Sequence, residues 1–218
     1  PGSTLKPFIY GMAFDDGVAS PDTRIADAPR RFATYRPDNF DRTFRGDVTV
    51  AQALQHSLNV PAVAALDAVG AQRFAAALSF AGADLSMPLT ADDDAGLAIA
   101  LGGAGMTVRD VALLYAALGD DGRALPLHWL KSESEAALTK KERETQIMSA
   151  QSARQIVEIL GSAPAPAGRM PALLTQEAPV IAFKTGTSYG FRDAWAAGTG
   201  NGSAVVVWIG RADSSPRP

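Results

Sequence analysis

Apolar residues recur at intervals of three and four along most of the chain before residue 162, which predicts a largely helical region. Thr49 and Thr107 are suited to cap helices, and Gly70 and Gly82 are suited to end them. Pro7 lies about one turn into the first helix, where a missing N–H costs least. The first expected helix spans residues 4–14 and ends near Gly17, and a second starts at residue 49. Further helices are expected over residues 60–69, 72–80, 107–118 and 149–160. The charged stretch 125–144 favours no element.

The pattern changes from helical spacing to short apolar runs near the C-terminus. An apolar run at Val180–Lys184 is followed by two more, Asp193–Thr199 and Ala204–Ile209, which flank an Asn-Gly turn at Gly200–Gly202. Three antiparallel strands are expected here. Residues 18–44 are rich in Pro, Arg, Asp and Asn, which predicts a structured loop or a short hairpin.

These elements predict an α+β fold in which a helical block precedes a sheet. The helical portion covers about residues 1–162, an Ala- and Pro-rich linker about 163–171, and the sheet portion about 178–210. The first residues lack the charged start and apolar core of a signal peptide, and no closing element follows the last strand. The chain is therefore expected to be a fragment, with any membrane anchor outside it.

Composition narrows the classes of function. The 218 residues are 47% hydrophobic and 20% charged, enough apolar material for one large domain or two small lobes. A net charge of -3 with no basic stripe argues against nucleic-acid binding. The absence of cysteine excludes disulfides, thiol nucleophiles and most structural zinc sites, and no metal or cofactor is expected. No apolar run reaches the roughly 18 residues that a membrane span needs.

The first candidate for chemistry is the pair Ser3 and Lys6. Residues three apart share a helix face, so the hydroxyl and the amine can meet. A serine needs a base to become a nucleophile, and a lysine whose pKa is lowered by burial or a neighbouring cation can serve. The serine also lies at a helix start, where N–H groups favour developing negative charge. The same spacing is common on exposed helices, so this pair alone decides nothing.

The second candidate is Ser57-Leu58-Asn59, between two helical segments. In an extended kink, Ser57 and Asn59 would point the same way. The hydroxyl could relay a proton, and the amide could orient both a substrate carbonyl and the lysine. A helix-breaking turn with a capping serine is the alternative.

The third candidate is Lys184-Thr185-Gly186-Thr187, which closes the apolar run of the first expected strand. A glycine at a strand edge lets a ligand backbone approach closely. Lys184 supplies positive charge and the threonine hydroxyls can hold a carboxylate, while a backbone N–H of this motif can pair with that of Ser3 as an oxyanion hole. A surface turn is the alternative.

The three patterns together resemble the signatures of penicillin-recognising serine enzymes, because each occurs once, in order, and in the expected structural context. The chain resembles the transpeptidase domains of penicillin-binding proteins that carry glycosyltransferase modules, and within these the penicillin-binding protein 1C group. The resemblance extends over nearly the whole chain. The stretches that carry it are Arg36–Asp41, Ser57–Val63, Gly102–Thr107 and Lys184–Trp195.

The resemblance implies a penicillin-binding, serine β-lactamase-like fold, with an antiparallel sheet flanked by helices and an all-helical lobe. It implies a D-Ala-D-Ala transpeptidase that cross-links peptidoglycan stem peptides and is trapped by β-lactams on Ser3. Lys6 would be the base, with Ser57, Asn59 and Lys184 as further catalytic residues and backbone N–H groups of Ser3 and Thr187 as the oxyanion hole. The expected substrate-binding residues are Thr185, Gly186, Thr187, Ser188 and Tyr189.

The resemblance also implies partners and a location outside what the residues themselves determine. A glycosyltransferase module and a membrane anchor are expected outside this chain, which would act at the periplasmic face of the bacterial inner membrane. The family has strands before the first motif and a closing helix after the last, and this sequence lacks both, so the expected sheet is incomplete.

Several alternatives remain at this point. A D,D-carboxypeptidase or a serine β-lactamase shares the motifs, and a non-catalytic β-lactam sensor or scaffold would bind without turnover. Tyr189, Phe191, Arg192 and Trp195 could shape the acceptor side, but packing of the aromatic rings in the sheet and an Arg192–Asp193 pair are favoured. A Ser-His-Asp triad at His56 is disfavoured, because no nucleophile elbow is present.

Overall fold

The C-terminal sheet is the centre of the computed structural model. The structure describes residues 1–32, 35–86, 93–133, 144–164, 180–188, 190, 192–211, 213 and 215. The sheet has the order β5-β6-β7 and is antiparallel throughout, which confirms the three expected strands. Asn201 (φ 51°) and Gly202 (φ 72°) form the tight turn between the last two strands, because both positions need a positive φ. The strands are β5 (Ala182–Thr187), β6 (Ala194–Gly200) and β7 (Ser203–Ile209).

The helices follow the expected boundaries within a few residues. Thr49 and Thr107 each accept a hydrogen bond from the backbone N–H three residues on, and Gln52 and Asp110 reach back to complete the capping boxes. Ser149 caps α7 with its hydroxyl, which accepts the backbone N–H of Ser152. The helices are α1 (Lys6–Asp15), α2 (Val50–Gln55), α3 (Asn59–Val69), α4 (Ala71–Phe80), α5 (Val108–Gly119) and α7 (Ala150–Gly161), with 3-10 helices η1 (Gly2–Leu5) and η2 (Asp93–Leu101).

Two short strand pairs interrupt the helical portion. β1 (Arg24–Asp27) pairs with β2 (Gly46–Thr49), and β3 (Arg123–Ala124) pairs with β4 (Thr145–Gln146), both antiparallel. β1 lies within the 18–44 stretch, for which a loop or a short hairpin is expected, and its partner β2 begins just beyond that stretch. The second pair brackets the stretch that favoured no element. Two-residue strands carry too little alternation for a sequence pattern to reveal them.

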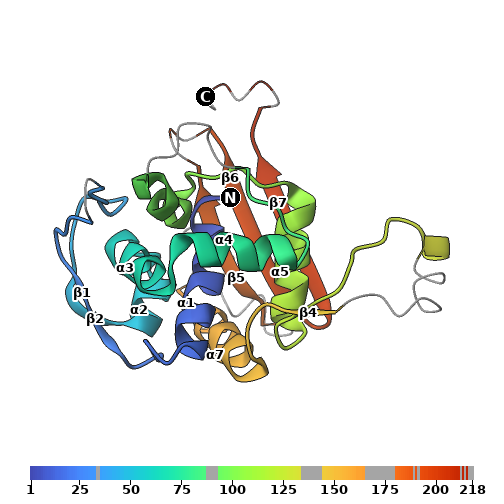
Figure 1. Ribbon diagram of the computed structural model, residues 1–218, viewed down its shortest axis with the longest axis horizontal. Helices are drawn as coiled ribbons and strands as arrows, with labels where there is room; N and C mark the ends of the chain where they lie inside the picture. The colour runs from blue at the N-terminus through green and yellow to red at the C-terminus, as the bar shows by residue number, and fades with distance from the viewer. Residues whose placement is uncertain are drawn as a thin grey trace, which may run out of the picture.

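The helices cover the sheet in a way that brings the N-terminus to β5. α5 packs against β6 and β7, α7 packs against β5, and α1 packs against α3 and α7. Figure 1 shows α5 in front of the strands and the β1–β2 pair at the opposite side of the molecule from the β4 end. The ring of Phe8 meets that of Tyr115 edge-on at 5.5 Å, and the Tyr115 hydroxyl donates to the carbonyl of Thr4. These contacts anchor η1 and α1 in the core.

The described part of the chain differs from the expected organisation in the first turn. Residues 165–171 of the expected linker lie outside the described residues. The first turn, Gly2–Leu5, is a 3-10 helix that leads into α1, not the start of an α-helix. A 3-10 helix has three residues per turn, so residues three apart lie directly in line. Ser3 lies in this tighter turn, and Lys6 begins α1 directly after it.

Candidate active site

Lys6 is the buried centre of the site. Its side chain has no exposed surface, and its ammonium donates to three oxygens of the turn between α2 and α3. The distances are 2.7 Å to the carbonyl of Ser57, 3.1 Å to that of Leu58 and 2.7 Å to Asn59 Oδ1. The Ser57 hydroxyl lies at 3.5 Å from the same nitrogen. Lys6 of the first candidate motif thus contacts Ser57 and Asn59 of the second through one nitrogen.

The ammonium of Lys6 lies in an environment that favours its neutral form. Burial lowers its pKa well below the usual value, and the positive charge of Lys184 lowers it further. The buried carboxylate of Asp27 opposes the shift. The oxygens around the ammonium act in the same direction as Asp27: each accepts a hydrogen bond from the ammonium and so favours the charged form of Lys6. The lowered pKa means that a larger fraction of Lys6 is neutral at a given pH than of an exposed lysine, and only the neutral amine can accept a proton.

The turn that holds Ser57 is strained. Ser57 has φ 57°, in the left-handed region that costs a non-glycine residue roughly 1–3 kcal/mol. Leu58 then returns to extended backbone, and Asn59 begins α3. The expected extended kink over all three residues is thus wrong for Ser57. The left-handed residue points its carbonyl, as well as its hydroxyl, toward Lys6, which an extended residue would not do.

The third motif lies inside β5 and not beyond its end. Lys184 pairs with Ala197 and Gly186 with Trp195, so the motif forms part of the ladder. Lys184–Thr187 are the last four residues of β5, so the motif closes this strand as expected and carries it beyond the apolar run. A six-residue strand whose last four residues are Lys-Thr-Gly-Thr has weak apolar alternation, and hydrogen bonds to β6 decide where it ends.

Glycines bring the first and third motifs together. A Cβ atom on Gly186 would lie 3.0 Å from the backbone nitrogen of Thr4, and one on Gly2 would lie 2.7 Å from the backbone nitrogen of Thr187. Neither space admits a side chain. The turn that carries Ser3 therefore lies directly against the C-terminal half of β5.

Lys184 is the second buried cation. Its side chain is 5% exposed and its ammonium donates to the carbonyl of Thr185 at 3.0 Å. Burial lowers the pKa of Lys184 to about 8. At neutral pH it remains charged, and no Asp or Glu of the described residues forms an ion pair with it. The charge is thus available to an anionic ligand.

A cleft of about 690 Å³ joins the three motifs. Ser3 is partly exposed and opens into it. Its hydroxyl is not among the described hydrogen-bond partners of Lys6, a looseness that is common before a substrate is bound. The predicted residues that line the cleft are Ser3, Ser57, Asn59, Thr185, Gly186, Thr187 and Ser188, whereas Lys6 and Lys184 lie behind its wall.

The loop after β5 meets its expectations in part. The Ser188 hydroxyl accepts the N–H of Asp193 at 2.8 Å, so it closes the loop in addition to lining the cleft. Trp195 is 7% exposed and packs in the sheet as favoured. Asp193 accepts from the indole N–H of Trp208 at 2.9 Å, which is not the expected Arg192 pair. The predictions for Tyr189 and Phe191 lie outside the described residues.

Two residues near the site carried no sequence signal of their own. Asn39 is 5% exposed and its Oδ1 accepts the backbone N–H of Asn59, while its Nδ2 donates to Asp27. Asp27 lies in β1 and is fully buried. Both residues come from a polar stretch that predicts a loop, so their burial could not be expected from the pattern. The only sequence feature that pointed to Asn39 was its position in Arg36–Asp41, one of the stretches that carry the family resemblance.

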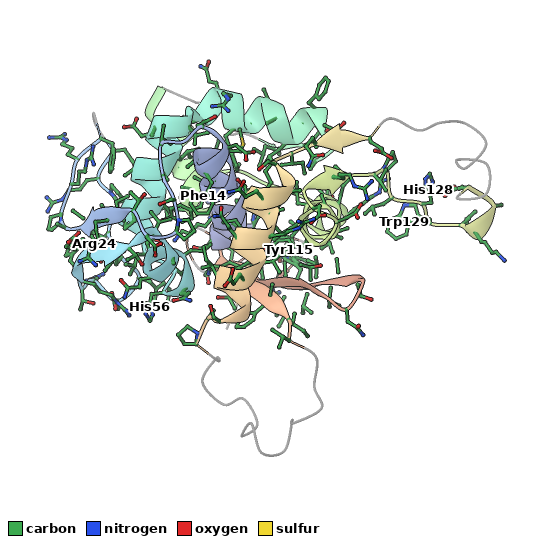
Figure 2. All side chains as sticks on the ribbon, turned by 90° about the horizontal axis from the view of Figure 1, so that it is seen from below. Phe14, Arg24, His56, Tyr115, His128 and Trp129 are labelled. Atoms are coloured by element: carbon green, nitrogen blue, oxygen red, sulfur yellow. The ribbon has the colours of Figure 1, made fainter. Side chains whose placement is uncertain are left out.

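The two histidines lie on opposite sides of the molecule. His56 is exposed at the end of α2 and lines the cleft, on the side that carries Arg24, whereas His128 projects on the other side beside Trp129 (Figure 2). Burial and the nearby charge of Arg45 lower the pKa of His56.

Within the described part of the chain, no helix is both long and apolar enough to cross a lipid bilayer.

Comparison with known proteins places the chain in a family. The family model described as the penicillin binding protein transpeptidase domain matches residues 1–216. This chain therefore belongs to the penicillin-binding protein transpeptidase domains. It is 41% identical over 99% of its length to penicillin-binding protein 1C of Escherichia coli, and 30% identical over 97% to penicillin-binding protein 4 of Bacillus subtilis. It spans 26% and 34% of these two relatives. The sequence-based resemblance to this family and to the 1C group is confirmed.

Solved structures show the same fold. Penicillin-binding protein 1A from Haemophilus influenzae matches 98% of the chain with a TM-score of 0.75 at 22% identity, and the chain covers 38% of it. The PonA1 protein from Mycobacterium tuberculosis, solved in complex with penicillin V, matches the whole chain with the same score and identity, and the chain covers 61% of it. The α+β penicillin-binding fold is thereby confirmed.

Proposed function

We propose that this chain is a peptidoglycan D,D-transpeptidase that forms an acyl-enzyme on Ser3. The observation that carries the proposal is the convergence of Ser57 and Asn59 on the buried ammonium of Lys6, one 3-10 turn from Ser3. A nucleophile, a base of lowered pKa and a relay hydroxyl are the groups that acyl transfer by serine requires. Membership of the family supports the same reaction type.

The acylation step follows from these positions. The Ser3 hydroxyl gives its proton to neutral Lys6, and its oxygen attacks the carbonyl carbon between the two terminal D-alanines of a stem peptide. The backbone N–H groups of Ser3 and Thr187 hold the resulting oxyanion, and loss of one such donor typically costs about 10²–10³ in turnover. The proton returns from Lys6 through the Ser57 hydroxyl to the leaving amine. The bond to the terminal D-alanine breaks and the ester on Ser3 remains.

The second step and the binding of substrate use the opposite wall of the cleft. An amine of another stem peptide attacks the ester, and Ser3 recovers its proton. The charge of Lys184 and the hydroxyl of Thr185 hold the terminal carboxylate of the first substrate. β5 is the edge strand of its sheet, so an extended peptide can pair with it in the cleft. A β-lactam would enter the same place and remain as an ester on Ser3.

Labelling with a fluorescent penicillin tests the proposal. We expect one covalent adduct per chain by mass spectrometry, on the peptide that contains Ser3. Ser3→Ala should abolish the adduct, whereas Ser20→Ala, which changes an exposed serine outside the cleft, should keep it. An unlabelled folded chain, or an adduct that survives Ser3→Ala, contradicts the assignment. Incubation with a pentapeptide and an acceptor amine then separates transfer from hydrolysis.

The wider setting is part of the same proposal. The curated relatives are roughly three to four times longer than the matched segment, since the chain spans 26% and 34% of them. We infer a glycosyltransferase module and a membrane anchor elsewhere in the natural protein, and action at the periplasmic face of the inner membrane. Protease accessibility of the site in spheroplasts, but not in intact cells, would be the expected result.

A further inference from the structure

A polar network beneath the cleft connects the β1–β2 pair to the base. Asn39 Nδ2 donates to both carboxylate oxygens of Asp27, at 2.8 and 2.9 Å, and to the carbonyl of Thr43 at 2.8 Å. Asn39 Oδ1 accepts the backbone N–H of Asn59 at 2.7 Å. Asn59 Oδ1 in turn accepts from Lys6. A continuous path of hydrogen bonds thus runs from Asp27 to the ammonium of Lys6.

The contact with Asn59 replaces a missing helix cap. The first N–H groups of a helix have no partner within it, and a Ser, Thr, Asp or Asn before the helix commonly supplies one. The residue before α3 is Leu58, which makes no such bond. Asn39, twenty positions earlier in the sequence than Asn59, supplies the oxygen instead. Asn39 therefore fixes the backbone at Asn59, while the carbonyl of Asp38 accepts from Asn59 Nδ2 at 2.7 Å and orients its side chain. The position of the Lys6 amine depends on both contacts.

Asp27 fixes which way the Asn39 amide faces. An ionised carboxylate only accepts hydrogen bonds, so the amide must turn its NH2 group toward Asp27 and its oxygen toward Asn59. The reversed amide would place oxygen against carboxylate and NH2 against the N–H of Asn59. The backbone N–H of Arg45 holds Asp27 Oδ2 at 2.8 Å from the other side. Hydrogen bonds from Asn39 and Arg45 therefore hold the carboxylate of Asp27 in one position, and this group has no exposed surface.

We propose that Asn39 and Asp27 are positioning residues of the acylation reaction, which act by orienting Asn59 and thereby the amine of Lys6. The proposal rests on the proposed function of Ser3 and Lys6. Neither residue opens a new route for protons. Their effect is to keep the acceptor of the Lys6 hydrogen bond at one place during proton transfer.

The charges around Lys6 make the pair electrostatically relevant as well. Lys184 from β5 lowers the pKa of Lys6, and Asp27 from β1 raises it. The further charged or titratable groups at the cleft are Arg36, Asp38, Asp41, Arg45 and His56. Removal of the Asp27 charge therefore has two separable effects: the amide of Asn39 loses its orientation, and Lys6 gives up its proton at lower pH.

Three variants test the proposal through the rate of acylation by a fluorescent penicillin, measured in the full chain from pH 6 to 10. Asp27→Asn sets an NH2 group against Asn39 Nδ2 in place of one of its two carboxylate contacts, and Asn39→Asp places two carboxylates face to face. Each should slow acylation by roughly 10- to 100-fold at pH 7, the size that small misplacements of reacting groups produce. The double variant Asp27→Asn/Asn39→Asp reverses the polarity of the pair and leaves an acceptor for Asn59. The double variant should acylate at least tenfold faster than either single variant.

The pH profile separates positioning from mere stability. The two carboxylates of Asn39→Asp can share a proton at low pH, so its rate relative to the unchanged chain should fall as pH rises. In Asp27→Asn, the rising limb of the profile should move to lower pH, because Lys6 loses a favourable charge. Asp47→Asn, which breaks the exposed Arg24–Asp47 pair of the same hairpin, should leave rate and profile unchanged.

Thermal unfolding of each variant makes every outcome decisive. Folded single variants that acylate at the unchanged rate and profile overturn the positioning role, even if they melt earlier. If both single variants fail to fold, the double variant decides: a folded protein within tenfold of the unchanged rate supports the proposal, and a slower or unfolded one overturns it. An unchanged chain that is not labelled at all would instead refute the proposed function, and the positioning role with it.

Discussion

The ammonium of Lys6 donates a 2.7 Å hydrogen bond to Asn59 Oδ1, across 53 positions of the sequence. This bond joins the helix that carries the proposed base to the turn that carries Ser57, the proposed proton relay. Because Lys6 is fully buried, its nitrogen cannot exchange these oxygens for water without opening the core. The position of the base is therefore set by the α2–α3 turn, not by the flexible lysine chain.

Replacement of Asn59 by Asp should shift the pH dependence of acylation. The new carboxylate would lie against the ammonium and raise the pKa of Lys6, so the neutral amine would form only at higher pH. The rising limb of the rate of acylation by penicillin should move up by about one pH unit or more. Asn201→Asp makes the same chemical change in an exposed turn outside the cleft and should leave the limb in place. An unshifted limb in Asn59→Asp would show that Lys6 is not the titrating base.

Lys184 should make the chain more stable at high pH. Its pKa is about 8 in the folded chain against 10.5 as the reference, so between these values the unfolded chain binds more protons. The free energy of unfolding should therefore rise with pH over this window, by up to about 3 kcal/mol, relative to Lys184→Met. Urea denaturation at pH 7, 8, 9 and 10 measures the difference. A difference that stays constant with pH would contradict the burial of a charged Lys184.

The strain at Ser57 predicts a difference between two substitutions that remove the same hydroxyl. Ser57→Gly relieves the left-handed backbone, whereas Ser57→Ala retains the strain, so the glycine variant should be more stable by about 1 kcal/mol. Both should slow acylation by roughly 10²-fold or more, because both remove the proton relay. Thermal unfolding and penicillin labelling check the two effects. Equal stability of the two variants would indicate that the turn relaxes without Ser57.

The close approach of the first turn to β5 predicts that Gly186 tolerates no side chain. A Cβ atom there would lie 2.9 Å from Thr4 Cγ2 and closer still to the carbonyl of Pro1. Gly186→Ala should cost about 1–3 kcal/mol of stability and about 10²-fold in acylation rate, since it forces β5 away from Ser3. Thermal unfolding and the rate of penicillin labelling measure the two losses.

Gly161→Ala is the matched control for Gly186→Ala. Its Cβ atom would meet only Val180 Cγ1 at 3.3 Å, a methyl group at the end of a side chain. We expect a near-normal melting temperature and an unchanged rate of labelling. Normal acylation by Gly186→Ala would show that the contact between the turn and β5 is not needed to place Ser3.

The amino-acid sequence determined the local elements and the chemistry of the motifs. Thr49 and Thr107 cap the helices expected from them, because a capping hydroxyl and the backbone N–H it accepts from lie within three residues. Asn201-Gly202 forms the turn expected from it for the same reason. The grouping of the three motifs could be expected only from the resemblance to a family, since no spacing in the sequence requires Lys6 to meet Asn59.

The tertiary structure alone decided which polar residues became buried around the base. Asp27 and Asn39 lie in a stretch whose composition predicts a loop, and only the pairing of β1 with β2 and the uncapped start of α3 bring them beneath Lys6. Likewise, Gly2 lies against the backbone of Thr187 and Gly186 against Pro1 and Thr4, which places the first turn against β5 through contacts that have no signature in the sequence. Such relationships depend on long-range packing, which local propensity and periodicity do not encode.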